Sequence, residues 1–480
     1  MKKIITAFLS ALLLPASLVS CMDNGDTDKY YTVTFDTEGG SPVPEPQTIL
    51  HGGYAVEPQE EITRGSESFI GWYSSTTGLK FNFVSNPITK NMTLKAKYWA
   101  GPKKYIVIND YDWAYDEKTI YQTFGDAKGK DVAVGEGVLM YIFQRDNDVN
   151  LNTIKRHCEE AEKYNVPVLF QFDPITFWDG TPELWNWFDP SLPGYDVSNR
   201  ENVEWYGWSS EQAVKIGWLN WGRQIRLKPM ANLFSGKYQA AVKERMGQYI
   251  GTVKKWYDSL PDEKKYLLIG IKITGELGVG VNNWYYAGGN DLYDKPESED
   301  PQSGINMYNK PSRSNGHVAT IGYAGVSSAG IKTSGEITGA DIAELEKRYT
   351  LWLSKYVMTL GFPREMIFAH AGGVDNDLEA CINDLVCPSW SFYGSDATDP
   401  RNATYCMDLL EHSDTPYWGI AEWAISSNDP NSWEAAVNSA FSLDRCRFLS
   451  MYCNVIGNNN GTTMNSAAIQ GIKLAQTVKY

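Results

Sequence analysis

The sequence is poor in the residues that bind metals and form disulfides. Among its 480 residues are five histidines and seven cysteines, with no CxxC pair and no two histidines at ligand spacing. Zinc motifs need several such residues at short, fixed spacings, so we expect no metal site and no cofactor. A fold that depends on many disulfides is not supported either.

Basic residues are in the minority as well. The 43 lysines and arginines face 58 acidic residues, which gives a net charge of −15. A chain this acidic is a poor partner for nucleic acid. The sequence has no glycine-rich phosphate loop and no serine nucleophile elbow, so nucleotide chemistry and serine-based hydrolysis lack support.

The one long apolar run lies at the start of the chain. Lys2 and Lys3 precede the apolar residues 4–19, and the run ends in Leu-Val-Ser-Cys at Cys21. This pattern predicts a signal peptide over residues 1–20, followed by an acidic tether over 21–29. The ending resembles a bacterial lipobox, which implies lipid attachment to Cys21. The acidic start resembles that of surface lipoproteins in Bacteroides-like bacteria.

These resemblances imply a location at the outer membrane, lipid-anchored and exposed at the cell surface. Several acyl chains on one cysteine anchor a protein firmly, since each buried CH₂ contributes about 0.8 kcal/mol. The anchor is the only membrane contact that we expect. An ordinary signal peptide with a chance cysteine is the alternative.

Residues 30–100 alternate in polarity and predict a small all-β module. We expect strands at 31–35, 69–73 and 92–99. Three motifs in order, VTFDTEGGS from Val33, FIGWY from Phe69 and LKAKYW from Leu94, resemble the Listeria–Bacteroides repeat. The resemblance implies a compact, β-grasp-like unit that serves as a spacer or an adhesive module on cell-surface proteins.

From residue 104 to 480, short apolar runs alternate with helical patterns, which favours parallel α/β structure. The eight expected strands are 105–109, 138–143, 166–172, 266–274, 366–371, 385–393, 417–424 and 448–455. The expected helices are 151–164, 237–259, 339–360, 402–412, 432–442 and 464–478. Eight such units predict a (β/α)8 TIM barrel with long loop insertions after the third and fourth strands.

The active site of such a barrel lies at the carboxyl ends of its strands, and two glutamates stand there. Glu276 follows the fourth strand and Glu422 ends the seventh, across the barrel. Glycosidic cleavage needs one protonated carboxyl group as acid and one carboxylate as nucleophile or base. The two glutamates are therefore the candidate catalytic residues. For Glu276, the alternative is a loop glutamate that forms a salt bridge to Lys272 or to an arginine.

Glutamates at these two positions resemble the clan A glycoside hydrolases. The resemblance implies that Glu276 is the acid/base, that Glu422 is the nucleophile and that Tyr393 orients Glu422. The chain departs from that clan at Gly275, where most members have asparagine. Gly275-Glu276-Leu277 resembles instead the fourth strand of the inverting β-amylases, so retention and inversion both stay open.

Tryptophan is concentrated in the insertion after the third strand. Seven of the 17 tryptophans fall between residues 178 and 221. Flat rings with a polar edge suit sugars, but they suit an aromatic cluster that holds the loop on the barrel equally well. The expected substrate-binding residues, from the insertions after the third and fourth strands and from the strand ends, are Asp173, Trp178, Asn282, Asn283, Trp284, His370, Trp390, Tyr393 and Trp423.

The sequence as a whole predicts a cell-surface glycoside hydrolase that acts on a polysaccharide or oligosaccharide. One alternative is a surface lipoprotein that binds glycans without catalysis. Another is an adhesin-like protein whose barrel is a scaffold for the β module. The sugar, the linkage and the oligomeric state are left open.

Overall fold

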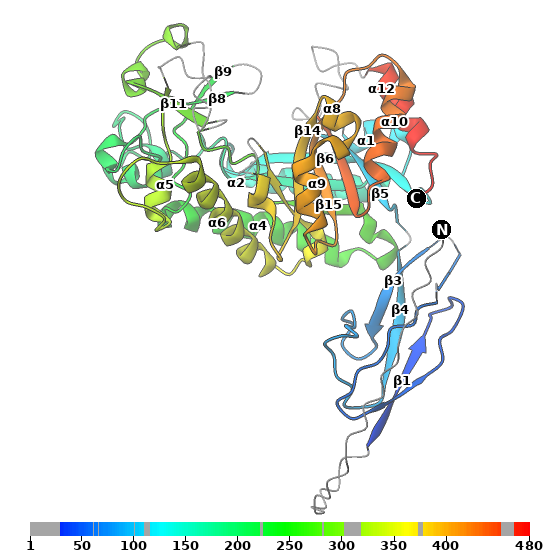
Figure 1. Ribbon diagram of the computed structural model, residues 1–480. Coiled ribbons are helices and arrows are strands. Elements are labelled where there is room, and N and C mark those ends of the chain that lie inside the picture. Colours follow the sequence, from blue (N-terminus) through cyan, green and yellow to red (C-terminus); the bar gives the residue numbers. More distant parts are fainter. Residues whose placement is uncertain are drawn as a thin grey trace, which may run out of the picture. The chain divides into compact units, whose positions relative to one another are not determined.

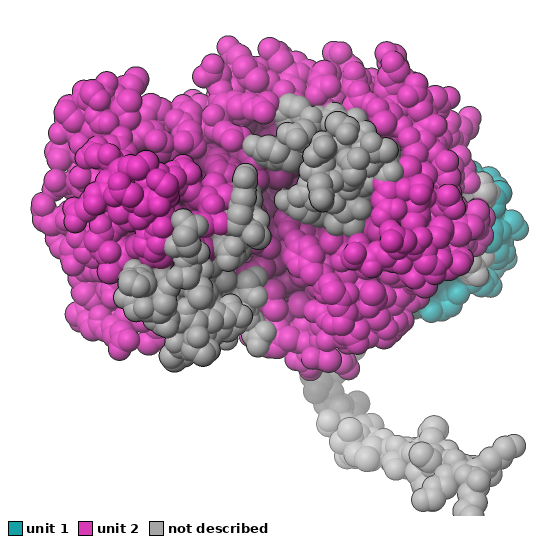
Figure 2. Space-filling model, turned by 90° about the horizontal axis from the view of Figure 1, so that it is seen from above, with its two compact units in different colours: residues 1–99 teal, residues 100–480 magenta. Residues whose placement is uncertain are grey.

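The computed structural model describes residues 29–60, 62–65, 67–99, 101–109, 116–220, 224–280, 283–301, 318–372, 378–452 and 465–480. The chain divides into two compact units, residues 1–99 (unit 1) and 100–480 (unit 2) (Figure 2). In the part of the chain that is described, no helix combines the length and the apolar character of a membrane span.

Unit 1 is a four-stranded sheet in the order β2-β1-β4-β3. Its central strands, β1 and β4, pair in parallel, and the two outer pairs are antiparallel. Alternation sets the two faces, because successive strand residues point to opposite sides. On β4, Leu94 and Ala96 are buried while Lys95 and Lys97 are exposed. The strands are β1 (Tyr30–Asp36), β2 (Gln47–Leu50), β3 (Ser68–Ser74) and β4 (Met92–Trp99).

The glycine pair after β1 has a steric role in unit 1. A Cβ on Gly40 would lie 1.9 Å from the hydroxyl oxygen of Tyr98, so a larger residue cannot take this position without displacing the ring. That hydroxyl donates a hydrogen bond of 2.7 Å to the carbonyl oxygen of Thr37. The turn and the last strand of unit 1 therefore hold each other in place.

The predicted barrel is confirmed in unit 2, where eight parallel strands close in the order β10-β13-β14-β15-β16-β5-β6-β7. Counted along the chain, β10 is the fourth strand of the barrel and β15 is the seventh. The barrel strands are β5 (Lys104–Asn109), β6 (Val132–Tyr141), β7 (Val168–Asp173), β10 (Leu268–Lys272), β13 (Ile367–Ala371), β14 (Cys387–Tyr393), β15 (Trp418–Ala424) and β16 (Cys446–Tyr452).

Helices surround the barrel, so its strands are buried on both faces and consist largely of apolar residues. Figure 1 shows α4, α6, α9 and α10 beside the strands. The helices are α1 (Glu117–Phe124), α2 (Asn147–Tyr164), α3 (Pro182–Trp185), α4 (Gly236–Ser259), α5 (Tyr323–Ser328), α6 (Gly339–Met358), α8 (Ser395–Thr398), α9 (Thr404–Glu411), α10 (Pro430–Phe441) and α12 (Ser466–Ala475).

The second barrel strand begins six residues earlier than the predicted residue 138. This earlier part of the strand contains Gly135 and Gly137, and both are close to the neighbouring strand. A Cβ on Gly135 would lie 2.4 Å from the carbonyl oxygen of Pro167. A Cβ on Gly137 would lie 2.9 Å from the side-chain nitrogen of Gln171. These glycines allow close approach of neighbouring strands.

The insertions after the third and fourth barrel strands combine into one lobe. Their strands form an antiparallel sheet in the order β12-β11-β8-β9, and β8 pairs with β11 through Trp218 opposite Trp284. The lobe strands are β8 (Gly217–Asn220), β9 (Gln224–Leu227), β11 (Asn283–Tyr286) and β12 (Val318–Ala319). An ion pair and hydrogen bonds fix this lobe: Asp300 accepts from Arg226 Nε at 3.0 Å and from the Trp218 indole at 2.9 Å.

Most tryptophans of the first insertion are interior residues of this lobe. The aromatic cluster that holds the insertion in place is the alternative that fits. Five are buried: Trp178, Trp185, Trp187, Trp205 and Trp218. Trp208 packs partly buried against the same core, and Trp221 lies outside the described residues.

Candidate active site at the barrel strand ends

The two candidate glutamates are held by side chains of a single strand. Ser391 on β14 donates a hydrogen bond of 3.0 Å to Oε1 of Glu276. Tyr393, two residues further along β14, donates a short hydrogen bond to Oε2 of Glu422. Residues two apart on a strand face the same side and stand about 6.6–7 Å apart. The two carboxylates are therefore gathered over the same face of β14, and both are half-buried.

A buried lysine stands among the carboxylates. Lys272 on β10 is 3% exposed, and burial lowers its pKa. The negative charges of Glu422, Asp173 and Glu276 act on it in the opposite direction. An ammonium group inside a barrel needs such compensation, because an isolated buried charge is very costly. Lys272 thus offsets part of the negative charge that the site collects.

His370 links this lysine to Glu276 through hydrogen bonds. The Lys272 ammonium lies 3.2 Å from Nδ1 of His370, and Nε2 of the ring lies 2.8 Å from the hydroxyl of Ser391. Burial, and then the charge of Lys272, hold the pKa of His370 well below its ordinary value, so the ring is neutral. A neutral imidazole has one donor and one acceptor.

The donor and acceptor in each of these hydrogen bonds follow from the two ends of the series, Lys272 and Glu276. An ammonium group only donates, so Nδ1 accepts from Lys272 and Nε2 carries the hydrogen. Ser391 then accepts from His370 and donates to Glu276. A carboxylate that receives such a donor is stabilised in its ionised form.

Tyr393 is about half exposed at the mouth of the site. Its pKa is raised, first by its partly desolvated surroundings and then by the charges of Glu422 and Glu276. The phenol therefore remains protonated and can act as a donor to Glu422. The orienting contact expected for Tyr393 is present.

Gly275 and Asp173 explain the departure from asparagine before Glu276. A Cβ on Gly275 would lie 2.4 Å from Oδ2 of Asp173, so no side chain fits. Asp173 itself is buried, and burial raises its pKa. It accepts hydrogen bonds from the amides of Ile175 and Thr176 and from the Thr176 hydroxyl, at 2.7, 3.1 and 2.7 Å. Asp173 fixes the start of the insertion rather than offering a free carboxylate to substrate.

Three tryptophans expected to contact substrate are packed inside the protein instead. Trp178, Trp390 and Trp423 are almost completely buried. Each indole N–H donates to a backbone carbonyl, of Pro229, Leu378 and Ala397 in turn, at 2.9, 3.0 and 2.7 Å. These bonds anchor neighbouring loops, and no ring face is left for a sugar.

The remaining predicted site residues lie in the lobe sheet, in the barrel interior or outside the described residues. Asn283 and Trp284 are buried in β11 of the lobe sheet, so they do not offer the surface that was expected. His370 is buried and reaches Glu276 only through Ser391. Asn282, like the strand-end residues Asp110, Asp112 and Asn454, lies outside the described residues.

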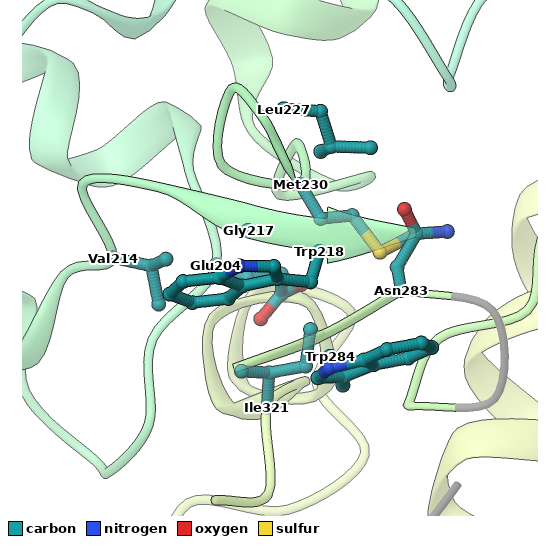
Figure 3. A pocket seen from close by; sticks show the side chains of 9 residues that line it. All are labelled: Glu204, Val214, Gly217, Trp218, Leu227, Met230, Asn283, Trp284 and Ile321. Atoms are coloured by element: carbon teal, nitrogen blue, oxygen red, sulfur yellow. The ribbon is translucent and has the colours of Figure 1, made fainter. Parts of the chain in front are cut away.

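A small cavity in the lobe is a separate feature. Figure 3 shows Trp218 and Trp284 lining it, together with Glu204. Burial raises the pKa of Glu204 to about 8, and its carboxyl oxygens accept from the amides of Ala324 and Gly325 at 3.1 and 3.0 Å. The cavity is too small for a sugar ring, and Glu204 ties two lobe segments together.

Sequence reasoning missed Ser391 and the role of Lys272. Strand alternation alone places Ser391 on the same face as Tyr393, so the signal was present. For Lys272, the expected alternative was a salt bridge to Glu276. The contact of its ammonium group is instead with His370.

Comparison with known proteins supports the assignment of unit 1. Residues 31–97 match the model of the Listeria-Bacteroides repeat domain. The predicted resemblance of this module is confirmed. No curated protein matches the chain.

Among solved structures, unit 2 is similar to glycoside hydrolases of family 5. One is a family 5 enzyme from Prevotella bryantii B14, with 10% identity, a TM-score of 0.38, and coverage of 78% of this chain and 96% of that one. Another is a broad-specificity endoglucanase from an uncultured bacterium, with 10% identity, a TM-score of 0.38, and coverage of 75% and 84%. A Bacteroidetes-affiliated cellulase has 7% identity, a TM-score of 0.38, and coverage of 78% and 90%. The barrel assignment stands on the strand pairing of this chain itself.

Proposed function

We propose that unit 2 is a glycoside hydrolase in which Glu276 and Glu422 act on the two sides of a glycosidic bond. The observation that carries the proposal is the pair of donors on β14, since Ser391 and Tyr393 hold the two carboxylates over one strand face. Two carboxyl groups that flank a bond are the minimal equipment for this reaction.

We assign Glu422 as the nucleophile or base and Glu276 as the acid. Glu422 accepts from Tyr393, which favours its ionised form and suits a nucleophile or a base. Glu276 donates its proton to the leaving oxygen, and the hydrogen bond from Ser391 to Oε1 holds this side chain in place. In a retaining enzyme the two carboxyl groups lie about 5–5.5 Å apart, and in an inverting enzyme about 6.5–9.5 Å. The anomeric configuration of the first product distinguishes these cases.

The test is the release of reducing ends from a panel of polysaccharides and oligosaccharides. The wild-type chain should hydrolyse at least one glycan, and Glu422→Gln should lower kcat by about 10³-fold or more, because it removes the attacking or activating carboxylate. Glu411→Gln, at an exposed helix end, is the matched control and should keep full activity. Full hydrolysis by both Glu276→Gln and Glu422→Gln would overturn the proposal.

The non-catalytic alternative makes a different prediction on the same panel. A glycan-binding protein would bind without turnover, and binding would survive both glutamine substitutions. The tryptophans of the insertion would have formed the glycan-binding surface of such a protein, but they are mostly buried. The adhesin alternative predicts that deletion of residues 30–99 abolishes attachment to glycan while unit 2 is unaltered.

We also propose that the chain is anchored at the cell surface through a lipid on Cys21. The support is the lipobox-like sequence around this residue, which lies outside the described residues. Cys21→Ser should move the protein from the membrane fraction to the soluble fraction, and protease added to whole cells should cleave the wild-type protein. Membrane association that survives Cys21→Ser would contradict the anchor.

A further inference from the structure

A second buried group of ionisable side chains lies between the barrel wall and two helices. Glu117 is on α1, Glu136 on β6 and His157 on α2. Alternation along β6 points Glu136 the same way as Val134 and Val138, which belong to the core that the barrel shares with its helices. We call Glu117, Glu136 and His157 the outer cluster.

The outer cluster is compact and buried. Nδ1 of His157 lies 2.9 Å from Oε1 of Glu117 and 3.4 Å from Oε2 of Glu136. One ligand atom from each residue can be chosen so that all three lie within 4.8 Å of one another. The three side chains are at most 1% exposed. Three potential ligand atoms thus converge from three separate elements.

Among the described residues, three of the four carboxylate oxygens in the outer cluster make no hydrogen bond, although Oε2 of Glu136 is within ion-pair distance of His157. Within the described part of the chain, neither oxygen of Glu136 has a hydrogen-bond partner, and Oε2 of Glu117 has none either. Buried carboxylates are ordinarily paired, hydrogen-bonded or bound to metal, because a buried ion without compensation costs several kcal/mol. Two carboxylates facing one imidazole leave negative charge that only protons or a cation can balance.

We propose that the outer cluster binds a divalent cation of the zinc class, with Glu117, Glu136 and Nδ1 of His157 as its ligands. An imidazole together with carboxylates suits zinc, whereas calcium and magnesium prefer sites made of oxygen alone. The ion neutralises the surplus charge and ties α1 and α2 to β6. Its role is structural, and it does not rest on the proposed hydrolase activity.

Protons and an arginine compete with the cation. Burial raises the pKa of Glu117 to about 7. Burial lowers the pKa of His157, but its contacts with the carboxylates of Glu117 and Glu136 outweigh burial and raise this pKa to about 9. A metal must displace these protons. The Arg156 guanidinium lies 2.9 Å from the outer ring nitrogen, Nε2, and only donates. When metal binds Nδ1, Nε2 carries a hydrogen, so Arg156 must turn towards Glu160, now 3.8 Å away.

The test measures zinc held by the purified full chain. The protein is stripped with EDTA, reloaded with Zn²⁺ and dialysed, and its metal content is determined. Wild-type protein should retain stoichiometric zinc and melt a few degrees higher than the stripped protein, because a ligand that binds only the native state stabilises it. His157→Gln and Glu136→Gln should retain none, while His412→Gln, at an exposed histidine, should match wild type.

Two further measurements keep the proposal falsifiable if the cluster variants fold poorly. Wild-type protein loaded with Co²⁺ should show the visible absorption of a protein-bound ion, and EDTA should abolish it. Arg156→Ala, which removes the competing donor, should hold zinc at least as tightly as wild type. Wild-type protein that retains no zinc, shows no cobalt band and melts identically with Zn²⁺ or EDTA would show that protons alone occupy the cluster and would overturn the proposal. Zinc retained equally by His157→Gln would do the same.

Discussion

Unit 2 contains two buried histidines in opposite electrostatic surroundings. His370 faces the ammonium of Lys272 beneath the candidate active site, and burial, and then this charge, hold its pKa well below the ordinary value. His157 faces two carboxylates behind the barrel wall, and its pKa is raised. The same side chain is thus a neutral relay in one place and a candidate metal ligand in the other. The charge of the neighbours, and not burial alone, decides between these roles.

We name the site group, Lys272, His370, Ser391 and Glu276, the inner cluster. It contains the ammonium group of Lys272, whereas the outer cluster sets two carboxylates against one imidazole. This difference predicts that the inner cluster is complete without metal and that the outer cluster is not. The predictions below break the inner cluster at successive points.

The largest effect is expected from removing the buried cation. Lys272→Met should lower the free energy of unfolding by about 3–5 kcal/mol, because it leaves buried carboxylates without a countercharge. If the variant folds, the acidic limb of its pH–activity profile should move to higher pH, since the carboxylates lose a neighbouring positive charge. Denaturant unfolding and initial rates across pH check both points. An unchanged profile would mean that Lys272 does not act on the site.

Removing the two donors on β14 should affect activity more than stability. Tyr393→Phe and Ser391→Ala should each lower kcat by about 10–100-fold, since a hydrogen bond to a charged group contributes about 1.5–3 kcal/mol. Ser442→Ala, at an exposed hydroxyl on the far end of α10, is the control. Activity near wild type in both variants would show that the shared strand face does not position the glutamates.

A methyl group at Gly275 should distort the site from the inside. Gly275→Ala places a Cβ against Asp173 and should cost about 1–3 kcal/mol through overpacking, with loss of hydrolysis. Gly236→Ala, where the added Cβ meets open space at the start of α4, is the matched control. It should be neutral or slightly stabilising. Equal effects in the two variants would contradict the tight contact at Gly275.

The smallest effect is the pH dependence of His370. The pKa of His370 is depressed in the folded state, so below about pH 6.5 the unfolded chain binds a proton that the native protein does not bind. Its contribution to stability is therefore present above pH 6.5 and is lost as the pH falls. Between pH 7 and 5.5 the wild-type protein should lose about 1 kcal/mol that His370→Phe does not lose. Urea unfolding at the two pH values checks this, with His412→Phe keeping the wild-type slope.

Much of the fold could be predicted because it depends on local patterns. The eight barrel strands appear as apolar runs between helical segments, and all eight are present, with Glu276 and Glu422 at the ends of two of them. The first six residues of the second strand were missed, and they include Gly135, whose small size allows close packing against the neighbouring strand. Helix α1, between the first two barrel strands, was not predicted.

The errors in the site have a common physical origin, since they depend on contacts between distant segments. Trp178, Trp390 and Trp423 have the composition of a sugar site, but burial can be read only from the assembled core. The expectation of no metal site rested on spacing along the chain, and the zinc measurement on the outer cluster tests it. Glu117, Glu136 and His157 come from three elements, so no short motif reveals them.

The most direct test of the account compares Glu276→Gln with Glu136→Gln in the same two measurements, hydrolysis rate per folded molecule and melting temperature in excess Zn²⁺. The account predicts that Glu276→Gln lowers hydrolysis by about 10²–10⁴-fold at nearly unchanged melting temperature, because it removes an acid/base group. Glu136→Gln should lower the melting temperature and leave the rate of the folded molecules intact. Full hydrolysis by Glu276→Gln, or a loss of hydrolysis in Glu136→Gln with no loss of stability, would contradict this division between a catalytic inner cluster and a structural outer one.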